Sequence, residues 1–159
     1  MISFPISKSG LMHPSQTGRI ESILVRPTRK RDPIVVEVWN VLSSEDHGKI
    51  TSNRAVTLLQ KEHLAVASAL AGHTIDWRKT RRNLLVSGIN LFSLVGHRFR
   101  IGNVLLEATV IVDPCKNMEE AMGAGTYAAM MGHGGIGAKI IEGGTIHVGD
   151  TVQWISSTS

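Results

Sequence analysis

Apolar and polar residues alternate along most of this chain in short runs, and the pattern predicts many strands and few helices. The first run, Gly18 to Pro27, has a period of two residues and ends at a proline, as expected for a strand. Similar runs predict strands over 33–41, 54–59 and 103–113, and the last is long enough to be central. Residues 136–155 predict two or three strands joined by tight, glycine-containing turns.

Helical patterns are fewer and shorter than the strand patterns. Residues 60–72 predict a helix, with apolar positions on one face and a glycine at the end. Two shorter helices are predicted over 118–122 and 127–131, and the glycine-rich stretch 132–137 follows them. That stretch predicts a tight connection between helix and strand or, alternatively, a lid or an anion-binding nest. The fold class expected is mainly β, a closed or partly closed β-barrel with a few short helices.

Composition limits the chain to one globular domain. It has 159 residues and 17.2 kDa, with 42% hydrophobic and 19% charged residues. We expect an N-terminal extension over 1–16 and a barrel domain over 17–155. The apolar runs are too short to cross a membrane, and the N-terminus has no apolar core of a secretory signal. We therefore expect a cytoplasmic protein without a membrane partner, which agrees with its single cysteine.

Positive charge is concentrated in two segments of a chain with a formal net charge of +4. The segments are 26–31 and 78–82, and together they hold eight of the seventeen lysines and arginines. The few aromatic residues do not alternate with these basic residues, so we do not expect a nucleic-acid partner. A small phosphorylated ligand fits the pattern, and two solvated basic loops without a partner remain the alternative.

Cys115 follows the predicted strand over 103–113 and precedes a lysine. Asp113 and Cys115 are two positions apart, so their side chains can project to the same side, and Pro114 restricts the turn between them. A thiolate here could act as a nucleophile or as a soft metal ligand, with Asp113 positioning a ligand or accepting a proton. From these residues alone, a cysteine packed in the core is the favoured interpretation.

The order of five segments along the sequence gives more weight to a functional role for Cys115. They are "GRIESILVRP", "EDHGKITSNRAVTLLQKEHLA", "RRNLLVSGINL", "GHRFRIGNVLLEATVIVDPCKNME" and "GGTIHVGDTV". In this order the chain resembles the MOSC domain, the module at the C-terminal end of molybdenum cofactor sulfurases, over about residues 17–153. The resemblance implies a β-barrel-like fold, in agreement with the strands predicted above.

The resemblance also implies a function and a site. Its best-understood relatives resemble the mitochondrial amidoxime-reducing component, in which a cysteine thiolate ligates the molybdenum of the pterin cofactor and N-hydroxylated compounds are reduced. Cys115 matches that cysteine, as catalytic residue and metal ligand. The other residues that the resemblance places around the molybdenum cofactor are Arg81, Arg82, Asn83, Asp113, His47 and Lys49.

Three functions follow as hypotheses, and whether the chain is an enzyme stays open among them. The first is the cofactor-carrying component of a molybdenum-dependent reductase of N-hydroxylated small molecules. The second is a sulfur carrier that uses a Cys115 persulfide in the assembly of a metal–sulfur cluster or cofactor. The third is a non-enzymatic barrel that binds a phosphorylated ligand. The chain contains no pyridoxal phosphate domain, iron–sulfur motif or flavin domain, so we expect an electron-transfer protein or a sulfur donor in trans.

Overall fold

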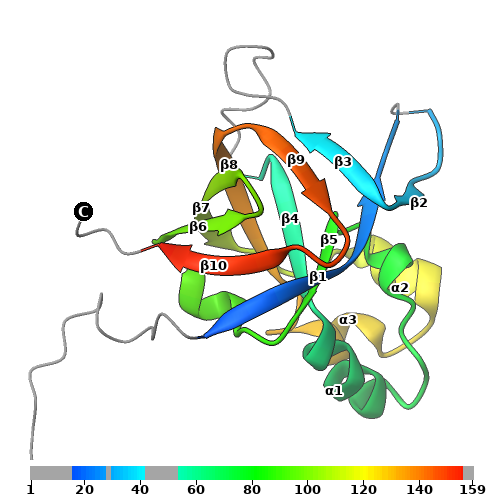
Figure 1. The fold of residues 1–159 in the computed structure, drawn as a ribbon. Coiled ribbons are helices and arrows are strands. Elements are labelled where there is room, and N and C mark those ends of the chain that lie inside the picture. Colours follow the sequence, from blue (N-terminus) through cyan, green and yellow to red (C-terminus); the bar gives the residue numbers. More distant parts are fainter. Residues whose placement is uncertain (1–15, 28–29, 42–53, 156–159) are drawn as a thin grey trace, which may run out of the picture.

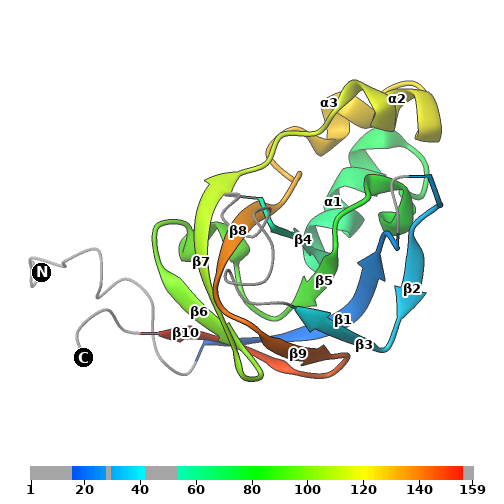
Figure 2. The same cartoon turned by 90° about the horizontal axis from the view of Figure 1, so that it is seen from above.

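A closed seven-strand barrel forms the body of the protein, with its α-helices gathered on one side (Figure 1 and Figure 2). The computed structural model describes residues 16–27, 30–41 and 54–155. The barrel strands are β1 (Thr17–Val25), β4 (Val56–Gln60), β5 (Leu84–Ser87), β6 (Arg98–Ile101), β7 (Val104–Ile111), β8 (Ile136–Glu142) and β10 (Thr151–Ile155). They run in the order β10-β6-β7-β8-β4-β5-β1, and pairing of β1 with β10 closes the ring. The predicted mainly β barrel is confirmed.

One predicted strand is divided in two. The apolar pattern over 33–41 predicted a single strand, whereas the structure has β2 (Ile34–Val36) and β3 (Val38–Val41) with a bend at Glu37. β2 pairs with β1, while β3 pairs with β9 (Gly144–His147) in a separate two-stranded sheet. The bend is stabilised by a hydrogen bond from the Val148 amide to the Glu37 carbonyl at 3.0 Å. The prediction was wrong here because the two halves pair with different strands.

The three α-helices lie where the sequence patterns predicted helices, whereas the two 3-10 helices were not predicted. They are α1 (Lys61–Ala71), α2 (Lys116–Met122) and α3 (Thr126–Met130), together with the 3-10 helices η2 (Trp77–Thr80) and η3 (Leu91–Leu94). α1 ends at Gly72, whose φ of 79° is the left-handed conformation that glycine adopts without strain. No helix within the described ranges has the length and apolar character needed to cross a membrane.

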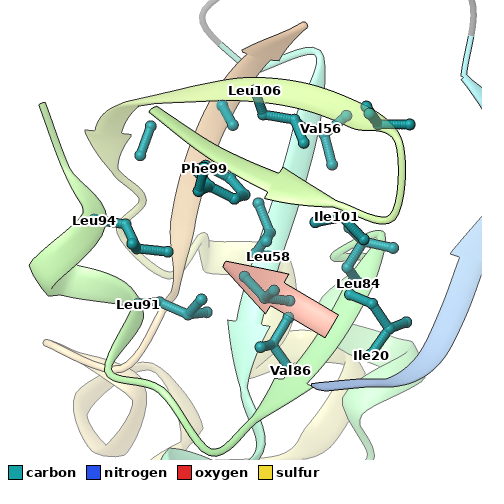
Figure 3. Close-up of a cluster of buried hydrophobic side chains, with 14 of the residues drawn as sticks. Ile20, Val56, Leu58, Leu84, Val86, Leu91, Leu94, Phe99, Ile101 and Leu106 are labelled. Atoms are coloured by element: carbon teal, nitrogen blue, oxygen red, sulfur yellow. The ribbon is translucent and has the colours of Figure 1, made fainter. Parts of the chain in front are cut away.

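Side chains from all seven strands fill the barrel (Figure 3). Strands β4 and β5 are buried on both faces, because alternate side chains of a strand point to opposite sides. Leu58 and Leu84 belong to the barrel core, whereas their neighbours Leu59 and Leu85 belong to a second cluster with helical residues that include Met118 of α2. The helices are therefore packed against the outer face of β4 and β5.

Two adjacent glycines let the connection between α3 and β8 pass close to other backbone. A Cβ atom on Gly134 would collide with the carbonyl oxygen of Val112, and one on Gly135 would collide with that of Leu58. Gly135 also has a φ of +92°, which side chains rarely tolerate. The Val112 amide donates to the Gly135 carbonyl at 2.9 Å, so this connection is joined to the end of β7.

We expect Gly135→Ala to lower the free energy of unfolding by about 3 kcal/mol or more, since steric overlap adds to the backbone strain of a positive φ. Gly132→Ala is the matched control, because Gly132 also has a positive φ, +82°, but open space around it. It should cost about 1–2 kcal/mol from backbone strain alone. Urea denaturation of both variants measures the difference, and equal losses would contradict the packing argument.

A pair of histidine rings connects α1 to the same glycine connection. His63 of α1 and His133 lie edge to face with ring centroids 4.9 Å apart, and His63 also contacts Phe92 at 5.6 Å. The Nδ1 atoms of both histidines are buried without a hydrogen-bond partner among the described residues. Burial lowers the pKa of His63, the charge of His133 lowers it further, and the carboxylate of Glu62 acts in the opposite direction.

This arrangement predicts a loss of stability in mild acid. Below the ordinary histidine pKa of about 6.5, the unfolded chain binds a proton that folded His63 resists, so the free energy of unfolding falls as the pH falls. Replacement of His63 by glutamine, which does not titrate, should reduce the difference in unfolding free energy between pH 7 and pH 5. Urea denaturation at the two pH values measures this difference. An equal loss of unfolding free energy between pH 7 and pH 5 in the parent and the variant would refute the role of His63.

Candidate functional site

Cys115 is an exposed residue at the rim of a pocket. It immediately precedes α2, and its carbonyl accepts a hydrogen bond from the Met118 amide at 3.0 Å. We call the adjoining hollow, of about 370 Å³, the cysteine pocket. Its lining residues come from the η2 segment and from α2: Lys79, Thr80, Arg81, Cys115, Asn117, Met118, Glu120 and Ala121. Of the two interpretations of Cys115, the structure contradicts a cysteine packed in the core.

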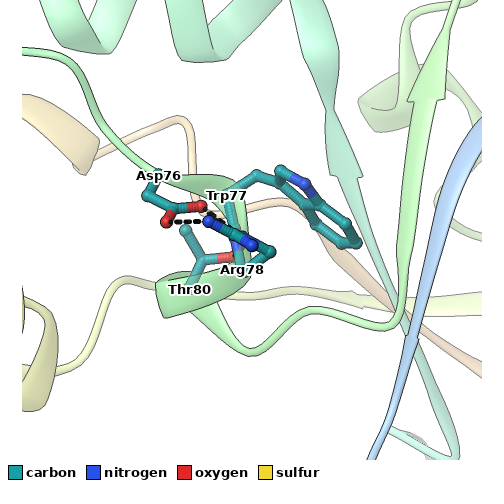
Figure 4. Close-up of polar contacts among 4 residues, drawn as sticks. All are labelled: Asp76, Trp77, Arg78 and Thr80. Carbon is teal, nitrogen blue, oxygen red and sulfur yellow. Dashed lines mark hydrogen bonds and ion pairs between the residues drawn. The ribbon is translucent and has the colours of Figure 1, made fainter. Parts of the chain in front are cut away.

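The η2 segment is held by its own polar contacts (Figure 4). Asp76 accepts a hydrogen bond from the Arg78 amide at 3.0 Å and forms an ion pair with the Arg78 guanidinium at 3.0 Å. Hydrogen bonding by Arg78 lowers the pKa of Asp76. Thr80 is buried and donates its hydroxyl to the Trp77 carbonyl. The charge of Arg78 is therefore compensated by Asp76 within this segment. The basic residues that line the cysteine pocket are Lys79 and Arg81.

Arg81 occupies an unusual backbone conformation. Its φ of 62° makes it the one residue other than glycine with a positive φ in the described part of the chain. This conformation closes η2, with a hydrogen bond from the Arg81 amide to the Arg78 carbonyl at 3.3 Å. The exposed side chain of Arg81 lines the cysteine pocket and also a smaller one of about 140 Å³, which we call the arginine pocket. The arginine pocket is lined by Leu24, Val25, Arg26, Pro33, Arg81 and Asn83.

Arg82 is directed inward instead. Its Nε donates to the Gly134 carbonyl at 2.8 Å and its Nη2 to the Asp113 carbonyl at 3.1 Å. Burial lowers the pKa of Arg82, and a negative charge on Cys115 acts in the opposite direction. The guanidinium therefore contacts the loop that precedes the predicted ligand Cys115, and all three of its nitrogens are bonded to backbone carbonyls. Arg82 is not among the residues that line the two pockets.

Asn83 joins three strands. Its Oδ1 accepts from both the amide and the hydroxyl of Thr57, at 3.0 and 3.1 Å, and its Nδ2 donates to the Leu24 carbonyl at 3.1 Å. The amide group thus connects β5 to β4 and β1. Asn83 also lines the arginine pocket. Binding of a cofactor by Asn83 stays a prediction, and its side chain has a structural role in any case.

The remaining predicted site residues are placed as follows. Asp113 is exposed and lies in the loop before Cys115, with its backbone carbonyl bonded to Arg82. Its side chain is not among those lining the cysteine pocket. His47 and Lys49 lie outside the described residues.

Two further basic residues were not singled out from the sequence. Lys79 lines the cysteine pocket and Arg26 lines the arginine pocket. Both belong to the two basic segments, which lie about fifty positions apart in the sequence but meet at Arg81. The clustering of charge was the only sequence signal for them, and it did not show which members face a pocket.

Comparison with known proteins agrees with this fold. A family model of the MOSC domain matches residues 43–153. No curated protein sequence matched the chain.

Several solved structures are similar to this chain in fold. The YuaD protein from Bacillus subtilis matches with a TM-score of 0.74 and 16% identity, covering 89% of this chain and 97% of that one. YiiM from Geobacillus stearothermophilus matches with a TM-score of 0.70 and 18% identity, covering 87% and 75%. YiiM from Escherichia coli matches with a TM-score of 0.62 and 18% identity, covering 89% and 71%. At these identities the likeness shows a shared fold. Since the family model covers most of the barrel, the chain belongs to the MOSC domain family.

Proposed function

We propose that this protein binds the molybdenum cofactor, with Cys115 as the protein ligand of molybdenum, and is the cofactor-carrying component of a reductase of N-hydroxylated compounds. The observation that carries the proposal is the exposed thiol of Cys115 in one pocket with Lys79 and Arg81. A thiolate is a soft ligand of the kind that molybdenum accepts, and cationic side chains bind a phosphate through charge-assisted hydrogen bonds. Membership of a family associated with this cofactor supports the same conclusion.

The dimensions and donors of the site fit such a group. A pocket of about 370 Å³ lies in the range of small-molecule sites, roughly 300–1,000 Å³. The soft donor and the basic residues come from two different segments that line the pocket. Cys115 precedes α2, whereas Lys79 belongs to η2 and Arg81 directly follows it. One end of an elongated anionic ligand can therefore meet the thiol while the other meets the cations. The adjoining arginine pocket extends the basic surface through Arg26.

Each residue then has a separate task. Cys115 supplies the thiolate, Lys79 and Arg81 bind and orient the anionic part of the cofactor, and Arg26 adds a second guanidinium beyond Arg81. When bound, the cofactor supplies two-electron oxygen-atom transfer to and from substrates. Reduction of an N-hydroxylated compound requires two electrons and two protons for each water released. We propose that a separate electron-transfer protein provides the electrons.

The first test is the molybdenum and pterin content of the protein expressed anaerobically with cofactor biosynthesis intact, beside Cys115→Ala. We expect close to one molybdenum per chain in the parent and at least a tenfold lower content in the variant, because the only thiol ligand is gone. Circular dichroism and melting temperature provide the folding control, and an exposed cysteine should be replaceable without large loss of stability.

The same experiment tests the second candidate function. An exposed thiol is also what a sulfur carrier requires, and this observation favours a Cys115 persulfide as the alternative. Absence of molybdenum and pterin from the parent would refute the cofactor proposal. Mass spectrometry of that protein would then decide between the two remaining functions, since a mass increase of one sulfur on Cys115 supports the carrier and an unmodified thiol supports a simple binding barrel.

The second test separates binding from stability at Arg81. Arg81→Gly removes the guanidinium but relieves a positive φ, which costs about 1–3 kcal/mol in a residue other than glycine. We expect an unchanged or higher free energy of unfolding together with about tenfold weaker retention of cofactor, the loss expected for one hydrogen bond to a charged group.

Arg98→Gln is the charge-matched control. Arg98 is an exposed arginine of β6 that lines neither pocket. The Arg98→Gln variant should retain as much cofactor as the parent. Equal retention in Arg81→Gly and the parent would contradict the assigned role of Arg81.

A further inference from the structure

Arg82 bridges two chain segments that are distant in sequence and adjacent in space. Its guanidinium donates from Nε to the Gly134 carbonyl at 2.8 Å and from Nη2 to the Asp113 carbonyl at 3.1 Å. A third, longer contact runs from Nη1 to the Thr80 carbonyl at 3.4 Å. All three acceptors are backbone oxygens, so a single side chain links the η2 segment, the loop before Cys115 and the glycine connection after α3.

The two segments that Arg82 bridges are in close backbone contact at Gly134, a position that cannot carry a side chain. A Cβ on Gly134 would collide with the Val112 carbonyl and would also lie 3.1 Å from the Asp113 carbonyl carbon and from the Pro114 nitrogen. β7 ends at Ile111, and the backbone bond from the Val112 amide to the Gly135 carbonyl lies before this loop. Pro114 has no amide hydrogen to donate. The hydrogen bond from Arg82 therefore holds the backbone at Asp113, two residues before Cys115, whose side chain carries the thiol.

Charge and shape both favour arginine at this position. A lysine keeps the positive charge, but its single ammonium cannot reproduce the planar fork that reaches two carbonyls in different directions. Arg82 thus connects the backbone of the loop before Cys115 to the glycine connection through both of its short bonds.

We infer that Arg82 is a positioning residue: it holds the Asp113–Cys115 loop against the Gly134 connection, so that the thiol of Cys115 faces the cysteine pocket. This role differs from direct contact with a cofactor, to which the sequence resemblance assigned Arg82. The inference rests on the proposed function only in taking Cys115 as the working thiol, and it applies equally to a molybdenum ligand and to a persulfide.

The test uses the full chain without cofactor. The amides of Val112 and Met118, bonded to the carbonyls of Gly135 and Cys115, lie on either side of the loop. We expect their hydrogen exchange to be about tenfold faster in Arg82→Ala than in the parent, with unchanged exchange at Leu58 and Leu106 in the barrel. Arg82→Lys should resemble Arg82→Ala, because charge without the fork does not hold the loop. Arg98→Lys, at an exposed position of β6, is the matched control and should exchange like the parent.

Chemical rescue distinguishes a specific position from general destabilisation. Methylguanidinium at millimolar concentration, well below denaturing levels, should slow the exchange at Val112 and Met118 in Arg82→Ala by entering the vacated space, and should leave the parent unchanged. Since Cys115 is the only cysteine, the rate of thiol alkylation by iodoacetamide reports on the same loop. We expect methylguanidinium to return the alkylation rate of Arg82→Ala toward that of the parent.

Two results would overturn the inference. One is parent-like exchange at Val112 and Met118 in Arg82→Lys, and this variant still provides a test if Arg82→Ala fails to fold. The other is a folded Arg82→Ala whose exchange and alkylation do not respond to methylguanidinium. Neither readout depends on molybdenum, so a failed cofactor proposal and a failed positioning role are distinguishable.

Discussion

Closure of the barrel is the constraint on which the rest of this structure depends. The first and last described strands, β1 and β10, pair through Thr17–Arg19 and Thr151–Gln153, so the ring of seven strands has no free edge. A closed ring must be filled from within, and fully buried side chains such as Phe99 and Leu106 do this. β4 and β5 are then covered from outside by α1 and α2. Cys115 lies on this covered flank because α2 begins directly after it.

The sequence predicted the barrel well because its strands are local patterns. Alternation of polar and apolar residues is visible within strands such as β1, whereas β4 and β5 are buried on both faces and do not alternate. The long apolar run of β7 agreed with its place between β6 and β8. The bend at Glu37 escaped prediction for a long-range reason. The residues on either side of it look like one strand, and the division arises only because β2 pairs with β1 and β3 with β9. No local pattern contains that information.

The sequence identified which types of residue form the site, but not the directions in which their side chains point. The basic segment and the cysteine were identified from the sequence, and the structure brings Arg81 and Cys115 to one pocket. Consecutive residues then diverge: Arg81 faces solvent, Arg82 is bonded to the carbonyls of Gly134 and Asp113, and the Asn83 amide joins strands. The left-handed conformation of Arg81 turns the chain at this point. Charge alone does not show which of the two arginines faces inward. The exposure of Cys115 was equally hidden, because a cysteine after a strand is more often packed.

The backbone of Arg81 gives the strongest physical reason to regard this surface as functional. A glycine at a φ of 62° would avoid a cost of about 1–3 kcal/mol, yet the position holds an arginine. Within the described ranges, Arg81 takes part in no ion pair that would offset this cost, whereas its neighbour Arg78 is paired with Asp76. The strain is tolerated because the surrounding residues are strongly fixed: Thr80 is buried, and the amide of Asn83 is bonded on both sides. A strained cation on a rigid support, beside an exposed thiol and without an ion pair among the described residues, is an arrangement that stability does not require and that the proposed binding of an anionic ligand would explain.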